Sequence, residues 1–257
     1  MRLWPDKSML SVLSAGWLLW VCTLGFTADD PDTAPKSTRP PLSSAARAAS
    51  IEALEEFNAL VGQWRGVGRP KRNSAVDGWF EKGEWIWEIK KEQVGLRYSV
   101  KDGKQVESGL LTFDPEKKMY HFDCTLADGS RRQYAGALER NRLVLLSEAK
   151  QDAPQHQLEI KLLSDKRTVL LYQSRQKPQQ QFTLVAEVGY TREGTRLAEE
   201  GAGGPECIVT GGKGTSSTVY KGKTYWFCCS GCRDAFQDDP EGIIAAAAER
   251  AAKKKAP

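Results

Sequence analysis

The chain has 257 residues, with 37 Lys and Arg against 33 Asp and Glu, a formal net charge of +4 and only two histidines. Because this small positive charge is spread along the chain, we expect no nucleic-acid partner. The sequence contains no Gly-x-Ser-x-Gly elbow, no His-Glu-x-x-His pair and no phosphate-cradling glycine loop, so we do not expect an enzyme.

Residues 1–28 have the pattern of a secretory signal peptide. Arg2 and Lys7 precede an apolar stretch over residues 9–26, which small residues and two aspartates follow. The pattern predicts an exported protein, either periplasmic or extracellular. The apolar length also reaches the lower limit for a bilayer span, so an uncleaved anchor stays open. No later apolar run is long enough to cross a membrane, which predicts no stable span once the signal is removed.

Residues 29–48 are rich in Pro, Ser and charged residues and predict a disordered linker. A short helix is expected to follow, capped by Ser50, because Leu54, Phe57 and Val61 fall on one face.

Residues 49–195 predict a mainly β domain. Apolar and polar residues alternate with period two, most clearly over residues 85–89, 158–162 and 182–190. Turn signals such as Asp-Gly and Asp-Pro recur about every ten residues. We expect eight to ten strands in an up-and-down antiparallel barrel, and no parallel α/β sheet.

Several side chains of this domain invite a functional interpretation. Cys124 shares the inward phase of Tyr120 and Phe122, which predicts a small buried hydrophobe. His121 has the opposite phase and His156 lies far from the closing strand, so we expect neither to ligate haem.

Three carboxylates of the same domain, Glu81, Glu84 and Glu88, are expected on a solvated strand face. A barrel of this size can hold one small apolar ligand. The sequence leaves open whether inward residues such as Trp85 and Trp87 line such a site or fill the core.

The two ends of the barrel segment carry short motifs. The first is the run from Leu60 to Gly66, which contains Gly62-x-Trp64, and the second is the run from Gly189 to Arg192. Over residues 52–193 the chain resembles the lipocalin-like barrels of an uncharacterised bacterial family. The resemblance implies that Trp64 plugs one end of the barrel and that Arg192 stacks across its ring, a structural role.

A second weak linker, residues 196–205, precedes a cysteine-rich segment over residues 206–248. Two β-prone runs around Lys221-Gly222-Lys223 predict a hairpin, and a short helix is expected from Ser230 or Gly231 to Phe236. Pro240 is well placed to begin a last, alanine-rich helix. Residues 249–257 form a basic tail that contains three lysines.

Four thiols lie in this segment: Cys207, Cys228, Cys229 and Cys232. Twenty residues separate the first from the second, and three separate Cys228 from Cys232. Thiolates are the ligands that Zn²⁺ and Cu⁺ prefer, and a helix N-terminus favours the thiolate form. The spacing therefore indicates a small metal-binding knuckle.

Around these thiols the segment resembles the YHS domain and the related TRASH knuckle, over roughly residues 203–245. The resemblance rests on Cys207-Ile-Val-Thr-Gly, on the run from Tyr220 to Cys232, and on Phe236. It implies a heavy-metal site with Cys207, Cys228 and Cys232 as ligands. The histidine found in many such domains has no counterpart between Cys207 and Tyr220. The fourth ligand stays open between Cys229, water, a carboxylate and a partner's group.

We expect a small apolar support around this site, formed by Tyr220, Tyr225, Phe227 and Phe236.

Other uses of the thiols remain open. Disulfides could staple the segment in an oxidising compartment, and Cys229 with Cys232 could form a redox pair. However, removal of the signal would leave five of the six cysteines, an odd number that argues against a framework built only of disulfides.

The sequence thus predicts an exported metal-binding protein that handles or senses a heavy metal, with zinc as a structural clamp or copper as a trafficked or sensed ion. The alternative is a barrel that binds a small apolar ligand and carries a purely structural disulfide or zinc knuckle. The sequence does not identify a protein partner.

Overall fold

The structure is a computed structural model that describes residues 40–70, 76–150, 153–178, 180–194 and 205–255. The predicted signal peptide and most of both predicted linkers lie outside the described residues. The described residues belong to one compact unit.

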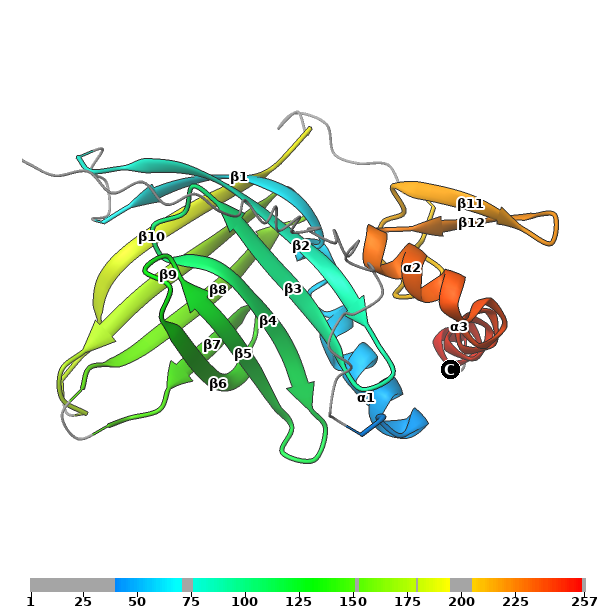
Figure 1. Ribbon diagram of the computed structural model, residues 1–257, viewed down its shortest axis with the longest axis horizontal. Coiled ribbons are helices and arrows are strands. Elements are labelled where there is room, and N and C mark those ends of the chain that lie inside the picture. Colours follow the sequence, from blue (N-terminus) through cyan, green and yellow to red (C-terminus); the bar gives the residue numbers. More distant parts are fainter. Residues whose placement is uncertain (1–39, 71–75, 151–152, 179, 195–204, 256–257) are drawn as a thin grey trace, which may run out of the picture. The chain divides into compact units, whose positions relative to one another are not determined.

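Ten antiparallel strands form a closed barrel, in which each strand pairs with its neighbours in sequence and β10 pairs with β1 (Figure 1). The strands are β1 (Gly62–Arg69), β2 (Trp79–Ile89), β3 (Val94–Lys101), β4 (Val106–Asp114), β5 (Met119–Leu126), β6 (Arg131–Glu139), β7 (Arg142–Ser147), β8 (Gln155–Ser164), β9 (Arg167–Arg175) and β10 (Thr183–Arg192). The predicted mainly β, up-and-down barrel is confirmed.

The alternating pattern places large side chains inside. In β2 every second residue from Trp79 to Ile89 faces inward, and Trp85 and Trp87 are fully buried. Trp85 stacks on Tyr98 of β3 with ring centroids 4.3 Å apart. Burial of such rings contributes much of the free energy of folding.

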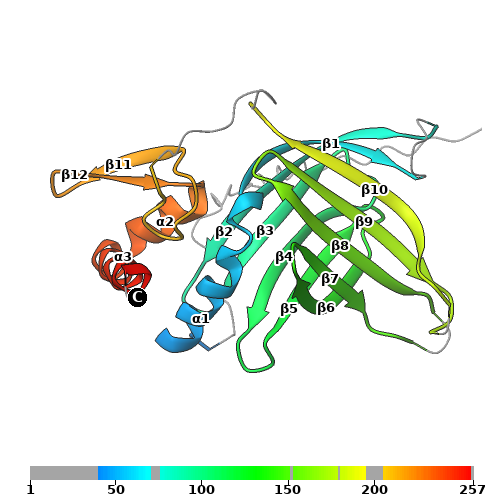
Figure 2. The ribbon, with the colours of Figure 1, turned by 180° about the vertical axis from the view of Figure 1, so that it is seen from behind.

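One end of the barrel is covered by helix α1 (Ser44–Glu55) and the 3-10 turn η1 (Asn58–Leu60), as Figure 2 shows for α1 beside β3 and β4. The prediction that the helix is capped by Ser50 is wrong. Ser43 is the N-cap, and its Oγ accepts a hydrogen bond from the backbone N–H of Ala46 at 3.1 Å. The alanine-rich run after this cap favours helix, so residues assigned to the linker join α1.

Arg192 and Trp64 meet where β1 pairs with β10. The guanidinium carbon lies 4.4 Å from the centroid of the Trp64 ring. Its Nη1 donates to the carbonyl oxygen of Val61 at 2.6 Å, and Trp64 Nε1 donates to that of Leu60 at 2.6 Å. The pair therefore ties the segment from η1 into β1 to the last barrel strand.

The prediction that Glu81 lies on a solvated strand face is wrong, because this residue is only 5% exposed. It shares the inward phase of Trp79, and the Nε1 of Trp79 and the hydroxyl of Tyr190 both donate to its carboxylate. The adjacent inward positions Gly66 and Gly83 leave space for the Tyr190 ring. Burial raises the pKa of Glu81, although the two hydrogen bonds oppose the shift.

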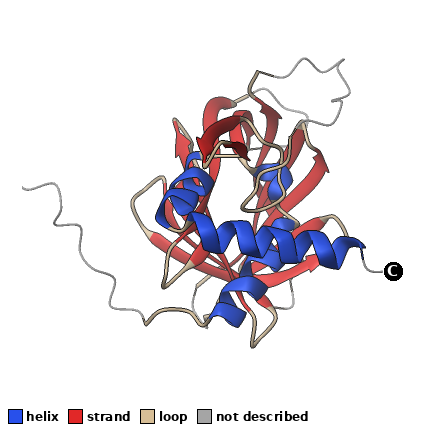
Figure 3. Ribbon diagram, turned by 90° about the vertical axis from the view of Figure 1, so that its right-hand side faces the viewer, coloured by secondary structure: helices blue, strands red, loops and turns tan. Residues whose placement is uncertain are grey.

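The C-terminal segment contains the hairpin β11 (Ser216–Tyr220) and β12 (Lys223–Phe227), followed by α2 (Ser230–Asp238) and α3 (Pro240–Lys255). These elements confirm the predicted hairpin and helices. Lys221 and Gly222 both have positive φ, 46° and 74°, as a two-residue turn between twisted strands requires. Figure 3 shows α3 running to the C-terminus, so helix includes much of the predicted basic tail. Within the described residues, no helix has both the length and the apolar character to span a bilayer.

Candidate metal centre

Cys207 is held in a tight loop that precedes the hairpin. Its backbone N–H donates to the carbonyl oxygen of Gly212 at 2.7 Å, and the N–H of Gly211 donates back to its carbonyl oxygen at 2.8 Å. Gly211 has φ +69°, a conformation that glycine adopts without strain. The loop closes on itself and leaves the Cys207 side chain buried beneath it.

The other thiols come from the junction between β12 and α2. Cys228 directly follows β12, and Cys229 is the N-cap residue of α2 with an extended backbone. Cys232 lies in the first turn of α2, where backbone N–H groups have no intrahelical acceptor. The positive end of this helix therefore favours thiolates at the cluster.

Three sulfur atoms converge. The Sγ atoms of Cys207, Cys228 and Cys232 all lie within 4.8 Å of one another, and all three residues are buried. The Cys228 and Cys232 Sγ atoms are 3.5 Å apart. Metal–sulfur bonds of about 2.3 Å in a tetrahedral site place two sulfurs roughly 3.8 Å apart. The described arrangement thus fits a thiolate-bound metal ion with little movement.

Hydrogen bonds within the cluster shift the pKa values of its thiols in opposite directions. Hydrogen bonds from the thiols of Cys228 and Cys232 lower the pKa of Cys207, whereas the same contact with Cys207 raises that of Cys228. Burial is the largest cause that raises the pKa of Cys232. Thr210 adds a hydroxyl 3.6 Å from Cys228 Sγ. A site that already stabilises a buried thiolate is suited to a cation.

Cys229 occupies a different position. Its Sγ lies 4.0 Å from that of Cys228, yet it stands outside the group of three that lie mutually within 4.8 Å. It accepts a hydrogen bond from the backbone N–H of Trp87 in β2 at 3.3 Å. The bond from Trp87 and the neighbouring thiols lower the pKa of Cys229, with Cys228 the largest cause. Cys229 therefore joins the cluster to the barrel.

The barrel and the cluster also contact each other through backbone. A Cβ at Gly231 would overlap the carbonyl oxygen of Trp87, so α2 begins directly against β2. Asn58 bridges the same region, since its Nδ2 donates to the Thr210 carbonyl oxygen at 2.7 Å and its Oδ1 accepts from Trp87 Nε1 at 3.1 Å. These contacts make the barrel part of the cluster's surroundings.

Aromatic rings pack around Phe236 of α2, the helix that carries Cys232. The Phe236 ring lies 5.7 Å from Tyr220, 5.0 Å from Tyr225 and 5.3 Å from Phe227, measured between centroids. Phe227 and Phe236 are almost fully buried, and Tyr220 and Tyr225 pack against the same core. The four residues expected around the thiols are thus gathered about α2.

Arg250 of α3 is a contributor that the sequence analysis missed. Its Nη1 donates to the carbonyl oxygen of Val209 at 2.6 Å and its Nη2 to that of Ile208 at 2.7 Å, both in the Cys207 loop. Nη1 also contacts the Glu55 carboxylate of α1 at 3.1 Å. Arg250 is the single arginine of the alanine-rich helix α3. This makes it noticeable in the sequence, but the sequence does not indicate which backbone carbonyls it contacts.

Comparison with known proteins agrees with this geometry. Residues 212–242 match the YHS domain family and form a YHS domain that follows the barrel. The matched range contains Cys228, Cys229 and Cys232, whereas Cys207 lies before it and is brought to the cluster by the fold.

No curated protein matches the chain. Among solved structures, the S-type phycobiliprotein lyase CPES from Guillardia theta is similar at 12% identity, over 61% of this chain and all of that chain, with a TM-score of 0.34. A TM-score this low carries no argument about function.

Proposed function

We propose that this protein binds one thiophilic metal ion through the thiolates of Cys207, Cys228 and Cys232, and that it is exported to handle or sense that metal. The observation that supports the proposal is the meeting of three buried thiols from two separate segments. A buried neutral thiol packs as a small hydrophobe, so it is the convergence of three sulfurs, and not their burial, that favours a metal. A cation bound between them would stabilise them as thiolates.

Copper in its +1 state suits the arrangement better than zinc. Soft thiolates select both ions, but structural zinc sites are almost always four-coordinate. The fourth thiol, Cys229, accepts a hydrogen bond from Trp87. A zinc site would need Cys229 to turn away from Trp87, or a ligand from outside the chain. Three thiolates suit Cu⁺ without either change.

We propose a binding role rather than catalysis, in a periplasmic or extracellular compartment. The role follows from the cluster's burial, because a metal ion enclosed by three buried side chains offers little room for a substrate. The export proposal rests on the signal-like pattern of residues 1–28.

The test is a metal titration of the full chain, reduced and kept free of oxygen. We expect one equivalent of Cu⁺ to be retained against a competing chromogenic chelator, and Zn²⁺ to bind more weakly. A Cys228→Ser/Cys232→Ser variant should retain none. Cys124→Ser is the matched control, since Cys124 is a buried barrel thiol whose Sγ contacts the Arg132 carbonyl oxygen and not the cluster.

Other results would contradict the proposal. Equal metal content in the double variant and the parent chain would place the site elsewhere. Failure of both metals to bind the reduced protein would favour a thiol–disulfide role for Cys229 and Cys232.

A further inference from the structure

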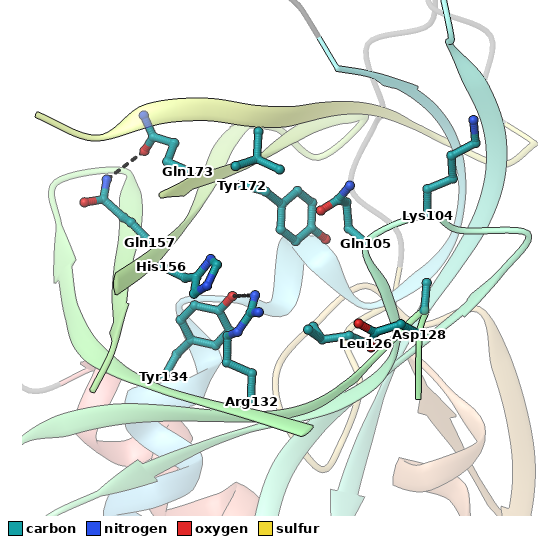
Figure 4. A pocket seen from close by; sticks show the side chains of 12 residues that line it. Lys104, Gln105, Leu126, Asp128, Arg132, Tyr134, His156, Gln157, Tyr172 and Gln173 are labelled. Carbon is teal, nitrogen blue, oxygen red and sulfur yellow. Dashed lines mark hydrogen bonds between the residues drawn. The ribbon is translucent and has the colours of Figure 1, made fainter. Parts of the chain in front are cut away.

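A cavity of about 230 Å³, with both polar and apolar walls, lies at the end of the barrel opposite α1 (Figure 4). Turns β3–β4 and β5–β6 form its rim, and side chains from β6, β8 and β9 form its walls. It belongs to a different part of the barrel from Trp87 and the metal centre. The cavity is thus a second candidate site, independent of the thiols.

Two tyrosines form much of its inner surface. Tyr134 and Tyr172 are 3% and 7% exposed, and Leu126 adds an apolar side chain beside them. Burial raises the pKa of both tyrosines, so their hydroxyls stay protonated, and that of Tyr172 hydrogen-bonds to Tyr98 in the core. Aromatic walls of this kind favour a flat, unsaturated ligand.

Arg132 supplies a positive charge at the same wall. Its Nη1 donates to the hydroxyl of Tyr134 at 3.3 Å, as Figure 4 shows. A guanidinium has five N–H donors in a planar fork, which matches the two oxygens of a carboxylate. Within the described residues, Tyr134 is the one side chain that accepts a hydrogen bond from Arg132. The remaining donors can reach a ligand.

The other polar groups around the cavity fit an anion. Burial and the charge of Arg132 lower the pKa of His156, so its imidazole is neutral and can donate one hydrogen bond. Lys104 stands at the rim, with Nζ 5.4 Å from the Trp79 ring. Asp128 is the rim's carboxylate, but its Oδ1 accepts from the N–H and hydroxyl of Ser130. The residues that line the cavity thus include two cations, Lys104 and Arg132, and one carboxylate, Asp128.

The volume limits the size of the ligand. A dry cavity of about 150 Å³ holds benzene, and drug-sized ligands need about 300 Å³ or more. A cavity of 230 Å³ lies between these values. One ring with a small substituent fits it, and a long acyl chain does not.

We propose that this cavity binds a small single-ring aromatic carboxylate, with the carboxylate on Arg132 and the ring between Tyr134 and Tyr172. A purely apolar ligand is disfavoured, because it would remove the guanidinium from water and give it no acceptor. The carboxylate instead forms charge-assisted hydrogen bonds with Arg132. His156 adds a donor from β8.

Benzoate is the probe, and isothermal titration calorimetry of the full chain is the measurement. We expect a Kd on the order of 0.1 mM, as is reasonable for a ligand of about nine non-hydrogen atoms. Benzyl alcohol, which has a similar size but no charge, should bind at least tenfold more weakly.

Arg132→Gln should weaken benzoate binding ten- to a hundredfold and leave the affinity for benzyl alcohol unchanged. Arg131→Gln is the matched control, since Arg131 is the adjacent exposed residue of β6 and lies outside the cavity lining. Tyr134→Phe provides a second variant that keeps the ring and removes one hydroxyl. Circular dichroism would confirm that each variant retains the fold.

Equal affinity for benzoate and benzyl alcohol, unchanged benzoate affinity in Arg132→Gln, or no binding of benzoate would each overturn the proposal. The titration needs no metal, so its failure would leave the proposed metal site untouched. Loss of metal binding in the thiol variants would likewise say nothing about this cavity.

Discussion

Single replacements of the three clustered thiols are expected to weaken metal binding by a hundredfold or more. Metal binding by a complete structural thiolate site provides about 10–16 kcal/mol, so one ligand of three or four accounts for roughly 3–4 kcal/mol. Cys207→Ser, Cys228→Ser and Cys232→Ser should therefore each lose at least about a hundredfold in affinity, measured by chelator competition.

Cys229→Ser is expected to behave differently, with a loss of tenfold or less. The Cys229 thiol accepts from Trp87 and stands outside the group of three sulfurs. Replacing a group that contacts a metal ligand typically costs 10–100-fold in affinity, and Cys229, whose sulfur is 4.0 Å from that of Cys228, is expected at the low end of that range. Cys124→Ser again serves as the control and should bind as the parent chain does. A loss in Cys229→Ser as large as that in Cys228→Ser would instead establish a four-thiolate centre.

Gly231→Ala is expected to lower the free energy of unfolding by roughly 3 kcal/mol, near the upper end for overpacking. The added Cβ would meet the backbone carbonyl of Trp87, which cannot rotate away as a flexible side chain could. For a unit of this size the melting temperature should fall by roughly 5–10 °C, measured by calorimetry on the metal-free protein.

Gly189→Ala provides the matched comparison. Gly189 lies in β10, and a Cβ built there has nothing within 4 Å. Its replacement should change the free energy of unfolding by no more than about 0.5 kcal/mol. If Gly231→Ala were as stable as Gly189→Ala, the close contact between α2 and β2 would not exist in solution.

The two glycine variants also separate docking from metal binding. Gly231 contributes no ligand atom, so Gly231→Ala should retain metal binding if the cluster folds without its contact to the barrel. A joint loss of stability and affinity would mean that the barrel holds Cys228 and Cys232 in position. Metal binding would then stabilise the contact between the two parts in return.

The barrel was predictable because its signal is repeated many times. Alternation recurs along the strands, and most turns between them contain a Gly, Asn or Asp. The hairpin and α3 were predictable for the same local reasons, since Lys221-Gly222 forms the turn of the hairpin and Pro240 begins α3. The start of α1 was harder to predict, because Ser43 is one of several short polar residues in this segment that could cap a helix.

Glu81 shows how a general rule can conceal a local signal. Carboxylates usually face water, yet Glu81 shares the phase of Trp79 and Trp85, and the period of two places it inside. The position of Glu81 in the alternating pattern of β2 indicates a buried side chain, whatever its residue type. Its partner Tyr190 could not have been found, because that pairing depends on how the barrel closes.

Contacts between distant segments had no signal in the sequence. Asn58 and Trp87 contact the cluster only because, in the folded chain, η1 meets the Cys207 loop and β2 meets α2. The same holds for the cavity, where Arg132 and Tyr172 come from strands β6 and β9. A single sequence indicates which residues could bind a ligand, whereas the register of the closed barrel decides which of them share a site.

X-ray absorption spectroscopy at the copper edge, on the full chain loaded with one equivalent of Cu⁺, would identify the atoms bound to the metal. We expect three sulfur neighbours at about 2.3 Å and no nitrogen neighbour, as Cys207, Cys228 and Cys232 would provide. A first shell of nitrogen or oxygen atoms, or a protein that retains no metal while its thiols are reduced, would contradict it.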